Sequence, residues 1–383
     1  MSATDALPPR RVLMTGDTVG GVWTYCLELA AALSRRGVDV ALATMGGLPS
    51  AEQRAAAARV PRLELHASAF KLEWMDDPWD DVAHAREWIA GLCERLRPDV
   101  LHANTYGHAE PPGAAAVHGL ADLPRVVVAH SCVTSWWRAV KGGPAPAAWD
   151  AYRGLVRAAL SDADAIVAPS AAMLDALRQE HGPLPRARVV PNGRDPGTLR
   201  PGEKRHVVLA AGRFWDEAKN LETLDRAATR LPWMVRVAGD CIDPSGRERR
   251  PQAVWPLGRL SAAEMSREMA QAAVFASPAR YEPFGLAILE AALCGCALVL
   301  ADIPSLRELW SGCARFVPAD DDAALAAAIA ELMRDDAARL RLARRALERA
   351  TRFGTAPMVD GILDCYAEAA GLRAGKERSA CAS

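Results

Sequence analysis

Short runs of β-forming residues alternate with helical stretches rich in Ala and Leu along most of this chain of 383 residues. Strands separated by helices favour parallel sheets, because each crossover helix covers a face of the sheet. The first series of predicted strands comprises Arg11–Thr15, Val38–Thr44, Asp99–Ala103, Arg125–His130, Ala165–Ala168 and Arg188–Pro191. The second series comprises Val207–Ala211, Val235–Ala238, Val254–Leu257, Val274–Ala276 and Ala297–Leu300. The pattern predicts an α/β protein with two doubly wound domains.

A segment dense in Pro and Gly, residues 191–204, separates the two series of strands. Such a composition is typical of a linker. We therefore predict an N-terminal domain at residues 1–195 and a C-terminal domain at residues 205–351, facing a central cleft. Ligands of doubly wound sheets bind beyond the carboxyl ends of the strands, so the sequence predicts binding there.

Bulk properties exclude several classes of partner. The formal net charge is −1, which gives no indication of binding to nucleic acid or to a strongly anionic membrane. No charge-free apolar run reaches the ~18 residues that a membrane span needs, and residues 1–10 lack the apolar core of a secretory signal. Nine scattered cysteines without paired CxxC spacing favour a reduced, cytoplasmic protein.

Residues 278–290 read Pro-Ala-Arg-Tyr-Glu-Pro-Phe-Gly-Leu-Ala-Ile-Leu-Glu and are the most informative stretch of the chain. Glu282 falls in a loop marked by Pro and Gly, and Glu290 falls on the predicted helix that follows. Gly285 lets the backbone approach a ligand, and N–H groups at a helix start are available to anionic oxygens. The pair suits a sugar nucleotide, with one acid on sugar hydroxyls and the other on ribose. The alternative is an ordinary pair of helix-surface acids, with Glu282 at the helix N-terminus.

Arg213 and Lys219 come directly after the predicted strand at residues 207–211 and before a helix. Two cations at the end of a parallel strand can hold a diphosphate, because Arg offers a planar fork and Lys a point charge. The helix that begins near Asn220 would add its dipole to this attraction. The alternative is a pair of solvated surface cations.

Two features of the N-terminal half also fall at strand ends. The pair Gly20 and Gly21 precedes the first helix and could approach a phosphate, although the surrounding sequence lacks the GxGxxG fingerprint of dinucleotide-binding proteins. Its alternative is a tight turn. His130 ends a predicted strand, where a neutral imidazole could bond a sugar hydroxyl or assist proton movement.

An aromatic and basic segment, Trp136, Trp137 and Arg138 with Lys141, follows His130 closely. Exposed Trp rings stack on sugar rings or lie at membrane interfaces. We therefore predict acceptor-side contacts here, which leaves peripheral contact with a membrane open. The alternative is a buried Trp pair beside solvated cations.

Together these motifs resemble the retaining glycosyltransferases of family 4, which have the GT-B fold. The match covers nearly the whole chain in order. It comprises Gly20-Gly21, His130, the strand end at residues 167–170, the segment Pro191-Asn192-Gly193-Arg194-Asp195, Arg213 with Lys219, and Glu282-Pro-Phe-Gly-Leu with Glu290. GT-B implies two Rossmann-like domains, with a crossover helix at about residues 352–383 returning to the N-terminal domain.

Two departures from the family pattern lie in the predicted phosphate-binding loop. Arg213 and Lys219 are six positions apart, one more than the commoner spacing. Asn220 stands where glycine is frequent. Both departures concern the geometry of the diphosphate site.

The resemblance also implies a role for each motif. Arg213 and Lys219 would hold the donor diphosphate and stabilise the charge on the leaving nucleotide. Glu282 would contact the donor sugar, Glu290 the ribose, and His130 the sugar near the reacting carbon. The remaining donor-binding positions that it implies are Gly20, Gly21, Phe284, Gly285 and Leu286.

The implied reaction moves a sugar from a nucleotide-diphospho sugar, most commonly a UDP-sugar, to an acceptor hydroxyl with retention of anomeric configuration. It requires no metal and no cofactor. The acceptor is a sugar, a lipid-linked molecule or a small molecule, as in polysaccharide or glycoconjugate biosynthesis. The alternatives are a sugar-nucleotide epimerase on the same fold and a non-catalytic partner subunit that binds sugar nucleotides.

Overall fold

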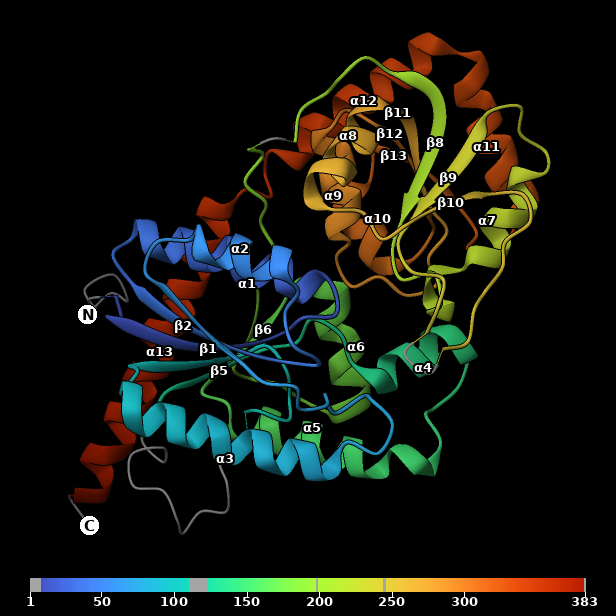
Figure 1. The fold of residues 1–383 in the computed structure, drawn as a ribbon. Helices are drawn as coiled ribbons and strands as arrows, with labels where there is room; N and C mark the ends of the chain where they lie inside the picture. The colour runs from blue at the N-terminus through green and yellow to red at the C-terminus, as the bar shows by residue number, and fades with distance from the viewer. Residues whose placement is uncertain (1–7, 110–122, 198, 244–245, 382–383) are drawn as a thin grey trace. The chain divides into compact units, whose positions relative to one another are not determined.

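The computed structural model describes residues 8–109, 123–197, 199–243 and 246–381 (Figure 1). The chain forms two compact units. The first unit consists of Met1–Ser135, Pro144–Gly193 and Thr355–Ser383, and the second of Trp136–Gly143 and Arg194–Gly354.

The first unit contains a sheet of seven strands, all parallel, in the order β3-β2-β1-β4-β5-β6-β7. The strands are β1 (Arg11–Asp17), β2 (Asp39–Met45), β3 (Leu63–Ala67), β4 (Val100–Ala103), β5 (Arg125–Val128), β6 (Ala165–Ala168) and β7 (Ala187–Val189). The strand order reverses between β1 and β4, which are neighbours in the sheet. Ligands of doubly wound sheets bind beside such a switch point, at the carboxyl ends of the strands.

Helices cover both faces of this sheet. They are α1 (Gly21–Arg35), α2 (Ala51–Ala58), α3 (Trp79–Leu96), α5 (Asp150–Asp162), α6 (Ala171–His181) and α13 (Thr355–Cys381), with a short 3-10 turn at Ala147–Trp149. On one face, Leu33 of α1 and Tyr366 of α13 share a core with Leu42 of β2. On the other, Ile89 of α3 packs with Leu13 of β1. The last helix thus completes the unit that the first strand began (Figure 1).

The second unit contains a parallel sheet of six strands in the order β10-β9-β8-β11-β12-β13. The strands are β8 (Arg205–Ala211), β9 (Met234–Ala238), β10 (Trp255–Gly258), β11 (Ala272–Ser277), β12 (Ala297–Ala301) and β13 (Ala314–Val317). Here the order reverses between β8 and β11. The loops that follow these two strands carry the residues predicted to bind the diphosphate and the sugar.

The helices of the second unit are α7 (Leu221–Ala228), α8 (Ala262–Gln271), α9 (Leu286–Leu293), α10 (Pro304–Trp310), α11 (Asp322–Arg334) and α12 (Asp336–Ala350), with a 3-10 turn, η3 (Glu217–Lys219). One core lies under α9 and α10, where Leu289 and Trp310 are buried with Phe275 of β11. A second lies under α7 and α11, where Leu224 and Ile329 are buried. Helix α4 (Val133–Lys141) begins in the first unit and ends in the second.

Each strand predicted from the sequence is present, with ends that shift by at most about two residues. Strands β3 and β13 were not predicted. Both are edge strands, and the four residues of β13 include exposed Arg315, so neither shows a continuous apolar run. The prediction that residues 136–143 belong to the N-terminal domain is corrected, because their polar side chains bond to the loop after β8 in the second unit.

Candidate active site

Close backbone packing shapes the loop after β8, which carries Arg213 and Lys219. The N–H of Gly212 donates to the carbonyl of Ala238 at 3.0 Å, and the N–H of Gly239 donates to the carbonyl of Gly258 at 2.8 Å. A Cβ on Gly239 would lie 1.9 Å from the carbonyl oxygen of Gly212, and its φ of 132° already disfavours other residues. The carboxyl ends of β8, β9 and β10 are therefore held together in a way that only glycine at 239 permits.

The longer spacing between Arg213 and Lys219 is accommodated by local turns. The N–H of Asp216 donates to the carbonyl of Arg213 at 2.9 Å, and η3 follows directly. The carboxylate of Asp216 caps η3 by accepting from the N–H of Ala218 at 2.9 Å. The Arg213 guanidinium lies over the Trp215 ring, 5.3 Å from its centroid, and 3.9 Å from the Asp216 carboxylate. A tight 3-10 turn thus absorbs the additional residue.

Lys219 and Glu282 form an ion pair, with 2.6 Å between Nζ and Oε2. Their side chains are 20% and 18% exposed, and they come from the loops after β8 and β11. The carbonyl of Glu282 also accepts from the Ser305 hydroxyl at 2.6 Å, which anchors this loop. The structure therefore brings together two of the residues predicted to bind the sugar nucleotide, and each balances the charge of the other.

Glu290 lies on α9 and forms a second ion pair, with 2.8 Å between its Oε1 and the Nε of Arg194. Burial raises the pKa of Glu290, and Arg194 partly opposes that rise. Arg194 belongs to the Pro191–Asp195 segment, and its N–H donates to the carbonyl of Phe353. The motif alone indicates no role for Arg194.

The start of α9 has the geometry predicted for a backbone binding site. Gly285 adopts φ 86° at the N-cap, and a Cβ there would lie 2.8 Å from Ile288. Phe284 is buried and packs edge-to-face on Phe353, while Leu286 begins the helix. Phe284 thus anchors the turn through its side chain, which leaves the backbone at this position as the part suited to a ligand.

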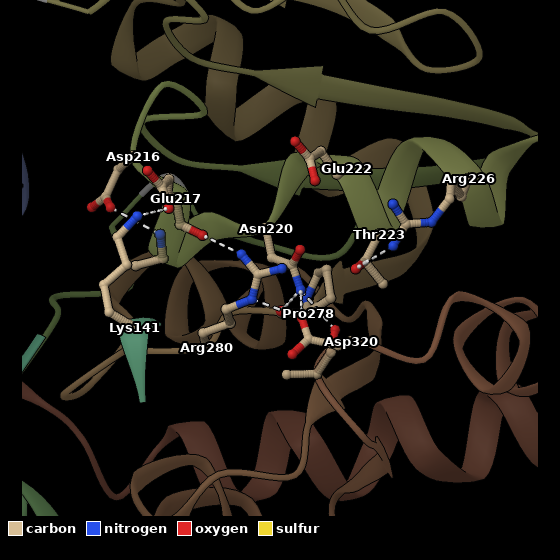
Figure 2. A network of polar contacts seen from close by, with 12 residues as sticks. Lys141, Asp216, Glu217, Asn220, Glu222, Thr223, Arg226, Pro278, Arg280 and Asp320 are labelled. Carbon is tan, nitrogen blue, oxygen red and sulfur yellow. Dashed lines mark hydrogen bonds and ion pairs between the residues drawn. The ribbon is translucent and has the colours of Figure 1, made fainter. Parts of the chain in front are cut away.

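Asn220 links the loop after β8 to the loop after β11 through hydrogen bonds (Figure 2). It has a left-handed backbone with φ 54°, which Gly and Asn tolerate best, so its substitution for glycine preserves the turn. Its Nδ2 donates to the carbonyls of Pro278 and Ala319 at 3.1 and 2.7 Å. Arg280 adds a backbone bond to the carbonyl of Ala218 and a guanidinium bond to that of Glu217.

The segment predicted to face the acceptor contacts the loop after β8. Trp136 Nε1 donates to Asp216 Oδ1 at 3.0 Å. Lys141 Nζ lies 2.6 Å from Glu217 Oε2 (Figure 2). The hydrogen bond from Lys141 is the main cause that lowers the pKa of Glu217. Lys141 also lies over the rings of Trp136 and Trp137, and Arg138 is half-buried on the same helix.

In the first unit, Gly20 and Gly21 lie at the carboxyl end of β1. Gly20 is the N-cap of α1 in an extended conformation, and its carbonyl accepts from the N–H of Trp23 at 3.2 Å. Asp17 holds the preceding turn by accepting from the N–H of Val19 at 2.9 Å. The predicted pair therefore lies at the start of a helix, where backbone N–H groups suit an anion.

His130 lies directly after β5 and is half-buried. Its Nε2 is 2.8 Å from Oδ1 of Asn104, and its ring packs edge-to-face on Tyr25, 4.5 Å between centroids. Burial lowers the pKa of His130 to about 3, with His102 contributing. The imidazole is therefore neutral near pH 7. Sequence reasoning missed Asn104, although it directly follows a predicted strand.

Comparison with known proteins gives the family. Residues 19–198 match the profile of Glycosyltransferase Family 4, and residues 205–335 match that of Glycosyl transferases group 1. A glycogen synthase of Mycobacterium tuberculosis is 31% identical over 283 residues, which cover 68% of this chain and 66% of that relative, just under two thirds of its length. The chain belongs to glycosyltransferase family 4. The D-inositol 3-phosphate glycosyltransferase of Xylanimonas cellulosilytica is 27% identical, and the match covers 93% of this chain and 93% of that relative.

Solved structures show the same fold. Sucrose-phosphate synthase from Thermosynechococcus elongatus superposes with a TM-score of 0.72 at 18% identity, covering 98% of this chain and 100% of that one. Anabaena HepE in complex with UDP-glucose gives 0.70 at 20% identity, covering 92% and 98%. The prediction of the GT-B fold with two Rossmann-like domains is thereby confirmed. Within the described ranges, no helix has the length and apolar character needed to span a membrane.

Proposed function

We propose that this family 4 member transfers a sugar from a nucleotide-diphospho sugar to an acceptor hydroxyl with retention of anomeric configuration. The observation that carries the proposal is the Lys219–Glu282 ion pair at the switch point of the second sheet. A diphosphate can take over Lys219, and a sugar hydroxyl can then donate to Glu282. The ion pair keeps the two charges near each other, where a donor can replace each partner.

Arg194 and Glu290 provide the second half of this argument. Glu290 lies eight positions after Glu282, on the helix that follows the loop. A carboxylate at this point can accept from ribose hydroxyls while Arg194 balances its charge. We therefore assign the nucleoside to Glu290 and the transferred sugar to Glu282.

The chemical step separates a sugar with oxocarbenium character from a negatively charged nucleotide. Fixed positive groups aimed at the leaving phosphate stabilise this charge most where water is excluded. Arg213, Lys219 and the N–H groups at the start of α9 are the proposed donors, so the reaction needs neither a metal nor a cofactor. In this proposal the leaving phosphate takes the acceptor proton, Glu282 positions the sugar, and neutral His130 accepts a hydrogen bond from it.

UDP is the proposed nucleotide, because Anabaena HepE, a protein of the same fold, was solved with UDP-glucose. The acceptor is proposed to be a hydroxyl of a sugar, a lipid-linked sugar or a small polyol. The names of two relatives, glycogen synthase and D-inositol 3-phosphate glycosyltransferase, support hydroxyl-rich acceptors.

The test is a donor screen followed by turnover. A donor present at about 100 times its dissociation constant should stabilise the protein by about 2.7 kcal/mol, and Lys219→Ala should remove the shift. With acceptor added, a retained glycoside should form. A new sugar nucleotide from donor alone would indicate an epimerase, and binding without turnover on any acceptor would indicate a partner subunit.

A further inference from the structure

Asn104 occupies a buried position at the centre of the polar cluster around His130. It follows β4 at the switch point of the first sheet and is 5% exposed. Its Nδ2 donates to the carbonyl of Thr15 at 2.7 Å, and its backbone N–H donates to Oγ1 of Thr15 at 3.1 Å. A carbonyl oxygen only accepts, so the amide nitrogen must face Thr15 and Oδ1 must face the histidines.

The orientation of this amide decides where the proton of His130 resides. The Oδ1 of Asn104 is 2.8 Å from Nε2 of His130 and only accepts hydrogen bonds. A neutral imidazole carries one proton, so a bond to Oδ1 fixes it on Nε2 and leaves Nδ1 with its lone pair. We propose that Asn104 is a positioning residue, which holds His130 as the Nε2-protonated tautomer so that Nδ1 accepts a hydrogen bond from the donor sugar.

His102 supports the same arrangement from within β4. Its Nε2 lies 3.3 Å from Oδ1 of Asn104 and 3.4 Å from the hydroxyl of Tyr25. Its Nδ1 lies 2.8 Å from the hydroxyl of Tyr366 on α13. Asn104 therefore connects the ends of β1, β4 and β5, and through His102 it is linked to the crossover helix.

The groups around this ring are neutral near pH 7. In the part of the chain that the structure describes, the titratable residues around His130 and Asn104 are His102 on β4, Tyr25 and Cys26 on α1, and Tyr366 on α13. Burial lowers the pKa of His102 to about 3 and raises the pKa of each of the other three groups. Asp17 is the acid whose charge further raises the pKa of Cys26.

An amide at position 104 therefore leaves the His130 ring neutral, whereas a carboxylate at the same position would favour its protonation. A carboxylate so close to the ring would stabilise the imidazolium and raise its pKa. The protonated ring would then lose the acceptor at Nδ1. The neutral amide orients the ring without inviting a second proton.

The first test reads the tautomer directly and does not depend on glycosyl transfer. Long-range proton–nitrogen NMR spectra of the full chain distinguish protonated from bare ring nitrogens, and His130→Gln assigns the signal by its loss. We expect Nε2 protonated and Nδ1 bare at neutral pH. A proton on Nδ1, or a mixture of tautomers, would overturn the proposal while leaving the proposed function intact.

The second test uses Asn104→Asp against Asn104→Leu. This second test rests on the proposed function, because it measures kcat/KM for glycosyl transfer as a function of pH. Between about pH 8 and pH 6, the Asn104→Asp variant should lose at least about tenfold in kcat/KM as its imidazole gains a proton, whereas the wild type stays flat. The Asn104→Leu variant should be slower at every pH without a new limb. Parallel profiles for both variants would refute the role, and the NMR result on the wild type decides if the Asn104→Asp variant does not fold.

Discussion

The two units place their predicted ligands in opposite electrostatic settings. In the second unit, Lys219 and Glu290 stand in ion pairs with Glu282 and Arg194. In the first unit, His130 is neutral and is held by hydrogen bonds to a buried amide. A diphosphate requires compensating charge, whereas a sugar hydroxyl requires an oriented acceptor. In the second unit, ion pairs therefore hold the proposed nucleotide-binding side chains in place. In the first unit, hydrogen bonds orient the proposed sugar-binding side chain.

Among single substitutions, the largest expected effect comes from Gly239→Ala, which strains the backbone under the charged half. Its Cβ would lie 1.9 Å from the Gly212 carbonyl oxygen. Strain and overpacking should reduce the free energy of unfolding by about 2–4 kcal/mol and displace Arg213. Urea denaturation measures this loss. Gly246→Ala is the control, because it also has a positive φ but no neighbouring atom within 4 Å, and an equal loss there would disprove the contact argument.

Acid should weaken the neutral half first. His102 and His108 in the first unit are fully buried, and burial lowers the pKa of each to about 3. The unfolded state binds more protons below pH ~6.5, so the unfolding free energy should fall by roughly 1.4 kcal/mol per pH unit for each ring as pH drops towards 3. Hydrogen exchange of β4 and β8 compares the units. His108→Gln should remove one ring's share, and equal acid sensitivity in both strands would break the comparison.

Lys219→Ala tests the charged half directly. Removing the ammonium leaves Glu282 unpaired and deprives the leaving phosphate of compensation, so kcat/KM for transfer should fall at least about tenfold, or about 1.4 kcal/mol. Steady-state kinetics against donor concentration measure it. Lys71→Ala is the matched control, since the Lys71 ammonium lies in the first unit and donates to the carbonyls of Asp76 and Asp77. Similar rates for both variants would remove Lys219 from the site.

Glu290→Gln should change how donor binding responds to pH. Burial raises the pKa of Glu290, so the carboxylate that receives ribose hydroxyls becomes protonated sooner as pH falls. Donor KM should therefore rise several-fold at low pH in the wild type. The Gln variant should start with a higher KM and remain flat. A wild-type KM independent of pH would show that this charge is not needed for the donor.

The smallest effect is a stabilisation of the neutral half through α13. Gly371→Ala adds a methyl group on an exposed helical position with no atom within 4 Å, and should gain up to about 1 kcal/mol of unfolding free energy. Gly361→Ala on the same helix should lose stability, since its Cβ would lie 3.0 Å from Val190. Thermal unfolding distinguishes them. A gain from both would mean that α13 is loosely packed.

The sequence predicted the sheets well because a buried parallel strand is a short continuous apolar run. Strands β1 and β12 are buried along nearly their full length and were predicted with small end errors. Strand β3 is an edge strand of half-exposed residues that include Glu64 and His66, so it lacks that signal. Local pattern therefore misses β3, where polar residues interrupt the apolar run, although the edge strands β7 and β10 were predicted.

The candidate site was predictable where function places a charge in a motif. Arg213, Lys219 and Glu282 follow strands, Glu290 lies on the helix after Glu282, and the pattern predicts these positions. Their partners were not predictable, because the Lys219–Glu282 contact joins positions 63 apart in sequence. The role of Asn104 depends on which way an amide points, and only the packing of Thr15 against it fixes that.

The return of α13 to the first unit has a consequence for how the chain is made. Synthesis proceeds from residue 1, so β1 to β7 leave the ribosome before Arg194–Gly354 of the second unit and before α13. Until then the face of the first sheet that buries Ile362 and Tyr366 is open, and His102 has no hydroxyl from α13. This apolar surface stays exposed while about 160 further residues are translated. Exposed apolar surface of this kind favours aggregation and chaperone binding.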